Sequence, residues 1–207
     1  MDDIVFFLQR QRSGQRMPEQ QDFPLPDGLP IPKDDGAANH LWNMSLPAIS
    51  LRSTSGRSID LLALNAPRMI IYCYPMTGVP GKPLPEGWDL IPGARGCTPQ
   101  SCGFRDLHME LSRFGAEVFG LSTQTTEYQR EMAGRLHLPF EVLSDAEFRF
   151  CDALRLPTFK VDGMRLLKRL TLVIREGRIE HVFYPVFPPN KSAEQVLHWL
   201  ENHKSHL

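Results

Sequence analysis

The run Met-Ile-Ile-Tyr-Cys-Tyr at residues 69–74 is the stretch that decides the fold. It is apolar at nearly every position, which is typical of a central strand covered on both faces. Residues 116–121 form a second buried strand of the same kind. A helical pattern lies between the two runs, so the sequence favours an α/β domain.

Shorter elements are predicted on either side of these two runs. Residues 47–51 and 57–61 predict a strand and its return across a Ser-Thr-Ser-Gly turn. Further strands are predicted at 140–143, 168–174 and 178–183, and helices at 125–137, 147–154 and 192–200. Alternating strands and helices, followed by an antiparallel hairpin and a closing helix, predict a three-layer α/β sandwich around a mixed sheet.

Two cysteines lie at the start of a predicted helix. The sequence Gly-Cys-Thr-Pro-Gln-Ser-Cys-Gly-Phe-Arg-Asp occupies residues 96–106, and Thr98-Pro99 suggests an N-cap followed by a first-turn proline. Apolar residues then recur at helical spacing as far as Phe114, and Gly115 can end the helix. Cys97 is therefore expected at the positive end of a helix dipole, where a nucleophilic thiolate is stabilised.

The spacing of Cys97 and Cys102 limits how they can react together. Residues five apart in an intact helix have Cα atoms roughly 8–9 Å apart, whereas a disulfide needs less than about 7 Å. A bond between them therefore requires the first turns of the helix to unwind. That requirement fits a cycle in which Cys97 becomes a sulfenic acid and Cys102 condenses with it. The alternative, two small buried residues of an amphipathic helix, stays open.

The connection between the first buried strand and this helix is long. Residues 75–96 hold five prolines and five glycines. Ligands of α/β sheets bind at the carboxyl ends of central strands, and loops of this length in compact domains are usually functional. With Trp88 to fix it, the loop is expected to be an ordered wall of the active site.

Composition restricts the partners and the compartment. The 207-residue chain has a formal net charge of -1, which gives no reason to expect nucleic acid or an anionic membrane as a partner. No apolar run is long enough to span a bilayer. The start, Met-Asp-Asp, lacks the basic residues and apolar core of a secretory signal, so a cytoplasmic location is expected. Four cysteines there are expected to be reduced or catalytic.

The chain is expected to divide into an N-terminal extension and a folded domain. Residues 1–44 predict a Pro-rich, partly mobile N-terminal extension with room for a short helix at 2–11. Residues 45–207 are expected to form the folded domain.

The sequence resembles the peroxiredoxins, specifically the bacterioferritin-comigratory or PrxQ group. Tyr-Pro at 74–75 and the cysteine motif at 96–106 carry the resemblance. Further matches follow in order at 118–122, 138–145, 169–174 and 177–179, so the likeness covers residues 46–200. It implies a thioredoxin-like fold, with a mixed central sheet flanked by helices, and reduction of hydrogen peroxide and organic hydroperoxides.

The resemblance also implies residue roles. Cys97 matches the peroxidatic cysteine, Cys102 the resolving cysteine of the atypical 2-Cys subtype, and Arg169 the arginine that holds the thiolate. A guanidinium can hydrogen-bond both the sulfur and the peroxide oxygens. The cycle needs no metal and no organic cofactor, and thioredoxin or a similar dithiol is expected to reduce the disulfide. A monomer or weak homodimer is expected.

Two positions depart from the family pattern. The usual hydroxyl three residues before the peroxidatic cysteine is replaced by Ala94, and the frequent Glu three residues after it by Gln100. Either Thr77 folds back beside Cys97, or Thr98 and backbone N–H groups near Gly96 orient the peroxide. Thr77, Gly96, Thr98 and Gln100 are therefore the candidate substrate-positioning residues.

Two other functions stay open. A thiol–disulfide oxidoreductase acting on proteins is one, although the chain lacks the C-x-x-C pair of that class. The other is a peroxide-sensing redox switch that binds a partner through the extension and the 75–96 loop. The remaining cysteines, Cys73 and Cys151, are expected to be packing residues.

Overall fold

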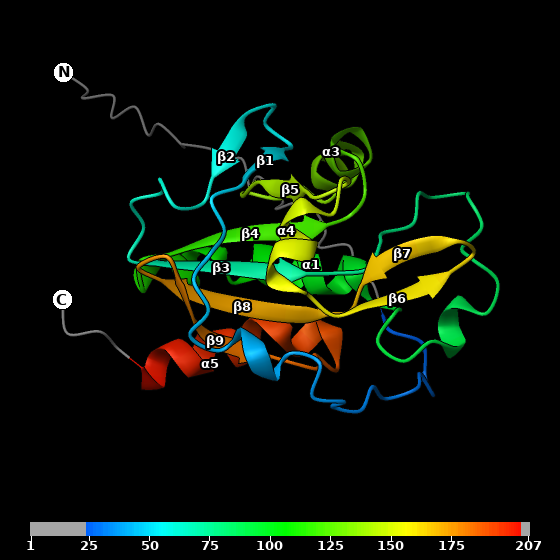
Figure 1. The fold of residues 1–207 in the computed structure, drawn as a ribbon. Helices are drawn as coiled ribbons and strands as arrows, with labels where there is room; N and C mark the ends of the chain where they lie inside the picture. The colour runs from blue at the N-terminus through cyan, green and yellow to red at the C-terminus, as the bar shows by residue number, and fades with distance from the viewer. Residues whose placement is uncertain (1–23, 204–207) are drawn as a thin grey trace, which may run out of the picture.

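A seven-stranded mixed sheet with helices on both faces forms the centre of the molecule (Figure 1). The structure is a computed structural model that describes residues 24–203; the helix predicted at residues 2–11 lies outside this range. The strands of the sheet are β1 (Ser50–Ser53), β2 (Ser58–Asp60), β3 (Arg68–Cys73), β4 (Ala116–Ser122), β5 (Val142–Ser144), β8 (Leu170–Arg175) and β9 (Arg178–Phe183). Their order is β2-β1-β5-β4-β3-β8-β9, with β3, β4 and β5 parallel and the other pairs antiparallel.

The helices match the predicted pattern with shifted ends. They are α1 (Cys97–Asp106), α2 (His108–Arg113), α3 (Thr126–Arg135), α4 (Arg149–Leu154) and α5 (Ser192–Asn202), with short 3-10 helices η1 (Asn39–Leu41), η2 (Trp88–Leu90) and η3 (Pro189–Lys191). The helix predicted to run on to Gly115 is in fact two helices, because regular helical structure is interrupted at Leu107.

Side chains of strand β3 pack into two core clusters, one on each face of the sheet, because successive side chains of a strand point to opposite faces. Ile70 and Tyr72 pack in the cluster formed with α1, α2, α3 and α5. Met69, Ile71 and Cys73 pack in the opposite cluster, with α4 and the segment around η1. In Figure 1, α4 lies in front of the sheet and α1 behind it. The predicted three layers are therefore present, with the helix of the two cysteines packed on one face.

One hairpin was not predicted. Strands β6 (Thr158–Val161) and β7 (Met164–Leu167) pair outside the main sheet. Their turn is Asp162-Gly163, and both residues have positive φ, 47° and 72°. Asp-Gly between two strands is a strong hairpin signal because a type I′ turn needs positive φ at both positions. The signal was present in the sequence and was missed.

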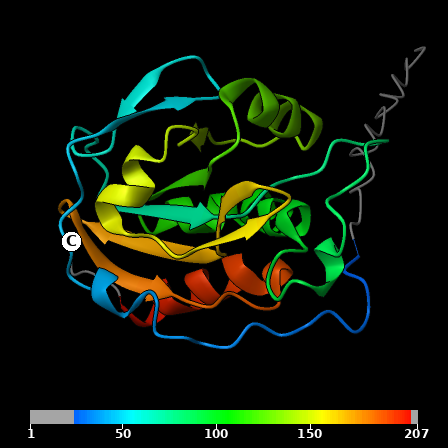
Figure 2. The same cartoon turned by 45° about the vertical axis from the view of Figure 1, so that its right-hand side comes forward.

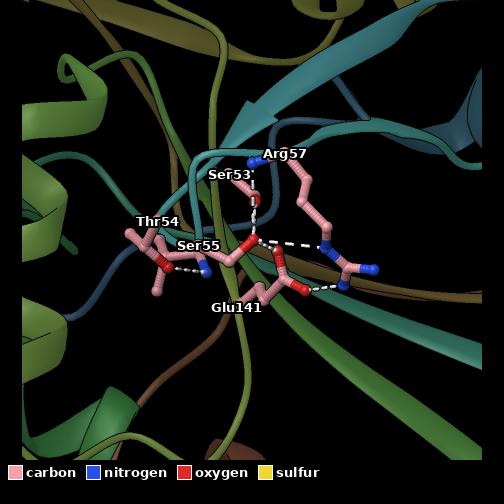
Figure 3. A network of polar contacts seen from close by, with 6 residues as sticks. Ser53, Thr54, Ser55, Arg57 and Glu141 are labelled. Atoms are coloured by element: carbon pink, nitrogen blue, oxygen red, sulfur yellow. Dashed lines mark hydrogen bonds and ion pairs between the residues drawn. The ribbon is translucent and has the colours of Figure 1, made fainter.

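A polar network fixes the turn between β1 and β2 (Figure 3). Ser55 donates a hydrogen bond of 2.7 Å to Glu141 and shares one of 2.9 Å with Ser53. Arg57 forms an ion pair with the same carboxylate. Burial alone would raise the pKa of Glu141, but these neighbouring donors hold it below its ordinary value. The network ties the turn to the segment that leads into β5.

The described part of the N-terminal extension follows the surface of the domain. Residues 24–44 run along the lower side of the view in Figure 2 and then rise to β1. Ala38 and Leu41 are buried in the core cluster on the α4 face of the sheet. The extension therefore contributes to the core near its end, while its first described residues lie near α1.

Candidate active site

Cys97 is the first residue of α1. The N-cap is Gly96, with φ of 103°, so the prediction that Thr98 caps the helix is wrong. A glycine is required there for two reasons: its φ is left-handed, and an added Cβ would lie 2.3 Å from Cγ of Pro189. The first helical hydrogen bond runs from Gln100 N to the Gly96 carbonyl at 3.1 Å. Pro99 has no N–H. The other backbone donors at the start of α1 are therefore the amides of Cys97 and Thr98.

Arg169 lies directly against the Cys97 sulfur. Its Nη2 donates to Sγ at 3.1 Å, and the side chain is almost fully buried just before β8. The guanidinium also donates to the carbonyls of Gly93 at 3.2 Å, Ala94 at 3.0 Å and Arg95 at 3.2 Å. These bonds join the end of the 75–96 loop to the cysteine, so the loop and the arginine hold each other in place.

The charge of Arg169 has no acidic partner within residues 24–203. Its acceptors there are three carbonyls, the Gln100 amide and the Cys97 sulfur. Burying an unpaired charge is costly, and a nearby charge of opposite sign offsets that cost. The sulfur is the one acceptor in this set that can become an anion. The guanidinium is therefore placed to stabilise negative charge that develops at this sulfur during a reaction.

Gln100 links the arginine to α5. Its Oε1 accepts a hydrogen bond from Nη1 of Arg169, and its Nε2 donates to Ser192 Oγ at 3.3 Å. Ser192 and Thr171 share a further hydrogen bond of 3.3 Å. All four side chains are buried. Gln100 thus positions the guanidinium rather than facing the cavity.

A cavity of about 240 Å³ opens onto Cys97. Thr77, Thr98 and Gly96 line it together with the cysteine, so the structure brings three of the four candidate positioning residues into one space. Its other lining residues are Pro24, Leu25, Pro26, Met76, Trp88, Ala94, Arg95 and Pro99. Trp88 is buried against Ala94 and Leu166, so it anchors the 75–96 loop to the domain.

Thr77 is held in the cavity wall by two side chains. Its hydroxyl donates to Gln124 Oε1 at 3.3 Å, and its carbonyl accepts from Gln124 Nε2 at 3.2 Å and from the Tyr128 hydroxyl at 2.8 Å. The hydroxyl hydrogen is therefore used, and the oxygen keeps acceptor capacity. Thr77 Oγ1 can therefore accept a hydrogen bond from an O–H group in the cavity.

Cys102 lies one and a half turns further along α1. It is a free thiol with 8 % of its surface exposed, and burial raises its pKa while Arg105 opposes that shift. The same helix is fixed on both sides. Phe104 stacks on Tyr72 with ring centroids 4.5 Å apart, and Gly103 lies against η3, where an added Cβ would be 3.3 Å from the Asn190 carbonyl.

The other two cysteines are inaccessible. Cys73 and Cys151 are fully buried free thiols in the core cluster on the α4 face, as predicted for packing residues. Within residues 24–203, no three His, Cys, Asp or Glu side chains come together as metal ligands. No helix in this part of the chain is long and apolar enough to cross a bilayer.

Three groups at the site were missed in the sequence. Ser192 and Gln124 follow η3 and β4, and Leu25 belongs to the extension. Gln124 could have been found from the sequence, because it directly follows a predicted central strand and residues after parallel strands gather at one edge of a sheet. Leu25 could not have been found in this way, because no local sequence pattern connects it with the distant Cys97.

Comparison with known proteins places the chain among thiol enzymes. The Redoxin family model matches residues 42–197. Peroxiredoxin Bcp of Escherichia coli strain K12 is 30% identical over 161 residues, covering 76% of this chain and 93% of that protein. The chloroplastic peroxiredoxin Q of Sedum lineare is 25% identical over 196 residues, covering 95% and 96%.

Solved structures share the fold. Peroxidoxin BcpB from Mycobacterium tuberculosis superposes with a TM-score of 0.65 at 23% identity, covering 79% of this chain and 98% of that one. Peroxiredoxin Q of Xanthomonas campestris gives a TM-score of 0.63 at 22% identity, with 78% and 98% covered. The expected thioredoxin-like sandwich is thereby confirmed.

Proposed function

Because the chain belongs to the redoxin family, as a peroxiredoxin of the Bcp/PrxQ group, we propose that Cys97 is its peroxidatic cysteine. The predicted family and its activity, thiol-dependent reduction of peroxides, are confirmed by these relatives. The observation that carries the assignment to Cys97 is the 3.1 Å contact between its sulfur and a buried guanidinium that has no carboxylate partner among residues 24–203.

The first step is a displacement on the peroxide O–O bond. The Cys97 thiolate attacks the terminal oxygen, the S–O bond forms, and the O–O bond breaks. Sulfur is oxidised by two electrons to a sulfenic acid, and the peroxide is reduced to water or an alcohol after the leaving oxygen takes up a proton. Arg169 and the amides of Cys97 and Thr98 supply donors toward the oxygens, where negative charge develops.

Thr77 is proposed to take the place of the hydroxyl that Ala94 lacks. It shares the cavity with Cys97, and its oxygen can accept a hydrogen bond from the peroxide O–H. Gly96 allows the close packing of the helix start, Thr98 lines the cavity, and Gln100 fixes Arg169 from behind.

Cys102 is proposed to resolve the sulfenic acid. Its sulfur attacks Cys97 Sγ, the S–O bond breaks, water leaves, and the disulfide forms. Helical spacing is too wide for that bond, so the start of α1 must unwind and part from Pro189 and Ser192. The raised pKa of Cys102 keeps it a thiol while the helix is intact, which delays this step until the helix opens.

Recycling requires two further electrons. A dithiol such as thioredoxin attacks the Cys97–Cys102 disulfide and leaves as a disulfide itself. We further propose that the chain acts as a monomer or weak homodimer in the cytoplasm, without nucleic acid or membrane partners. One relative, the peroxiredoxin Q of Sedum lineare, is named as chloroplastic.

Trapping the intermediate tests the proposal. The Cys102→Ser protein, treated with one equivalent of hydrogen peroxide and then with dimedone, should carry the dimedone adduct on Cys97. Peptide mapping locates the adduct. Adducts on Cys73 or Cys151 instead would contradict the assignment, and untreated protein supplies the control.

A further inference from the structure

A segment outside the family match contributes to the cavity at Cys97. The Redoxin model begins at residue 42, whereas Pro24, Leu25 and Pro26 line the cavity in front of the sulfur. We call residues 24–26 the Pro-Leu-Pro segment. It is the part of this wall that comes from the chain's own N-terminal extension rather than from the redoxin domain.

Leu25 makes the closest contact of this segment with the helix start. A Cβ built on Gly96 would lie 2.9 Å from Cδ2 of Leu25, so the leucine methyl group rests directly on the N-cap of α1. Leu25 is half-buried, while the prolines on either side are exposed. Their rings fix φ, which limits the conformations by which the leucine could leave the cavity.

The lining of the cavity includes both polar and apolar side chains. Thr77, Cys97 and Thr98 supply groups that can hydrogen-bond a peroxide. Leu25, Met76 and Trp88 supply apolar surface to the same cavity. The volume of about 240 Å³ far exceeds the space of one or two waters, about 30 Å³ each, that hydrogen peroxide would fill. The cavity therefore has room for an organic group attached to the peroxide, and apolar side chains that can contact it.

We propose that Leu25 is a specificity-determining residue that holds the organic group of an alkyl or aryl hydroperoxide. This inference rests on the proposed function, since it needs Cys97 as the oxidised residue. Contact with an apolar group stabilises the complex in proportion to the apolar surface removed from water. Hydrogen peroxide has no such group, so its reaction does not use Leu25.

Selective kinetics test this role. The rate constant for oxidation of Cys97 is measured by stopped flow with cumene hydroperoxide and with hydrogen peroxide, using tryptophan fluorescence. Leu25→Ala should slow the cumene hydroperoxide reaction by at least about fivefold and change the hydrogen peroxide reaction by less than about twofold. Leu25→Met keeps the size and apolarity of the side chain, so this variant should keep most of the wild-type rate with cumene hydroperoxide.

A matched control lies in the same extension. Ile31 is 68% exposed and does not line the cavity, so Ile31→Ala should leave both rate constants unchanged. Equal slowing of both peroxides by Leu25→Ala would overturn the inference, because it would mean a structural role. Unchanged or faster reaction with cumene hydroperoxide would also overturn it. A wild type in which hydrogen peroxide leaves Cys97 unoxidised would contradict the proposed function itself.

Discussion

Two cysteine–arginine pairs lie on opposite faces of the sheet, and their surroundings differ. Nη2 of Arg169 is 3.1 Å from the Cys97 sulfur, and Nη2 of Arg165 is 3.6 Å from the Cys151 sulfur. Both cysteines are in the first turn of a helix, α1 or α4. Each cysteine therefore has an arginine and a helix start beside it, although we assign peroxide reduction to Cys97 alone.

Burial and two carboxylates distinguish the surroundings of Cys151. In α4, the Asp145 carboxylate accepts from the amides of Phe150 at 3.0 Å and Cys151 at 2.7 Å, so the donors of that helix start are occupied. Arg165 pairs with Asp152 at 2.7 Å. Burial, together with these acidic neighbours, raises the pKa of Cys151 to about 11 in spite of Arg165.

The Cys97 site lacks both carboxylates. Glycine caps α1, and Arg169 meets no Asp or Glu in the described chain. A cavity also reaches Cys97, whereas Cys151 is fully enclosed. On the proposed assignment, an arginine beside a thiol is not sufficient for reactivity. The guanidinium and the helix donors must be free of other anions, and the sulfur must be reachable.

The largest expected effect separates the two cysteines directly. Cys97→Ser should abolish peroxide turnover with a dithiol donor, because no thiolate remains to attack the O–O bond. Cys151→Ser should keep turnover within about twofold of wild type. Consumption of hydrogen peroxide in the presence of thioredoxin measures both. Retained turnover in Cys97→Ser would move the chemistry to another residue.

The next effect concerns Cys102, whose pKa is raised by burial. The attacking species is the thiolate, and the ordinary pKa of a cysteine already lies above pH 8, so the thiolate fraction rises throughout the range below pH 8 whether α1 is intact or open. Disulfide formation after oxidation should therefore accelerate by about tenfold per pH unit between pH 6 and 8. Quenched alkylation followed by mass spectrometry gives the rate. A rate independent of pH in this range would contradict the expectation.

Removing the two arginines sharpens the comparison further. Arg169→Met should slow oxidation of Cys97 by at least about tenfold, since a hydrogen bond to a charged group contributes about 1.5–3 kcal/mol. Arg165→Met, the matched control, should leave that rate unchanged. Stopped-flow fluorescence with hydrogen peroxide measures both variants. Equal rates in all three proteins would assign the role to another cation near the cavity, such as Arg95.

A smaller effect is expected at the residue behind the arginine. Gln100→Leu keeps the size of the side chain but loses its bonds to Arg169 and Ser192, so oxidation should slow by about threefold. Thermal unfolding distinguishes this positioning role from a loss of fold. A rate that falls only in proportion to unfolded protein would exclude the positioning role.

Much of this site could be predicted from the sequence, because its signals are local. The apolar run at 69–74 and the cysteine motif indicated the strand and the helix that follows it. The N-cap was misassigned because Thr98-Pro99 has the composition of a cap, whereas close packing against Pro189 makes Gly96 the cap. Leu25 and Ser192 reach the site by long-range packing, which no periodicity records.

Peptide mapping of the oxidised wild type tests the central claim most directly. The protein is treated with one equivalent of hydrogen peroxide, alkylated in denaturant without reduction, digested and examined by mass spectrometry. The account predicts an intramolecular Cys97–Cys102 disulfide with Cys73 and Cys151 alkylated as free thiols. A disulfide that includes Cys73 or Cys151, or that joins two chains, would contradict it.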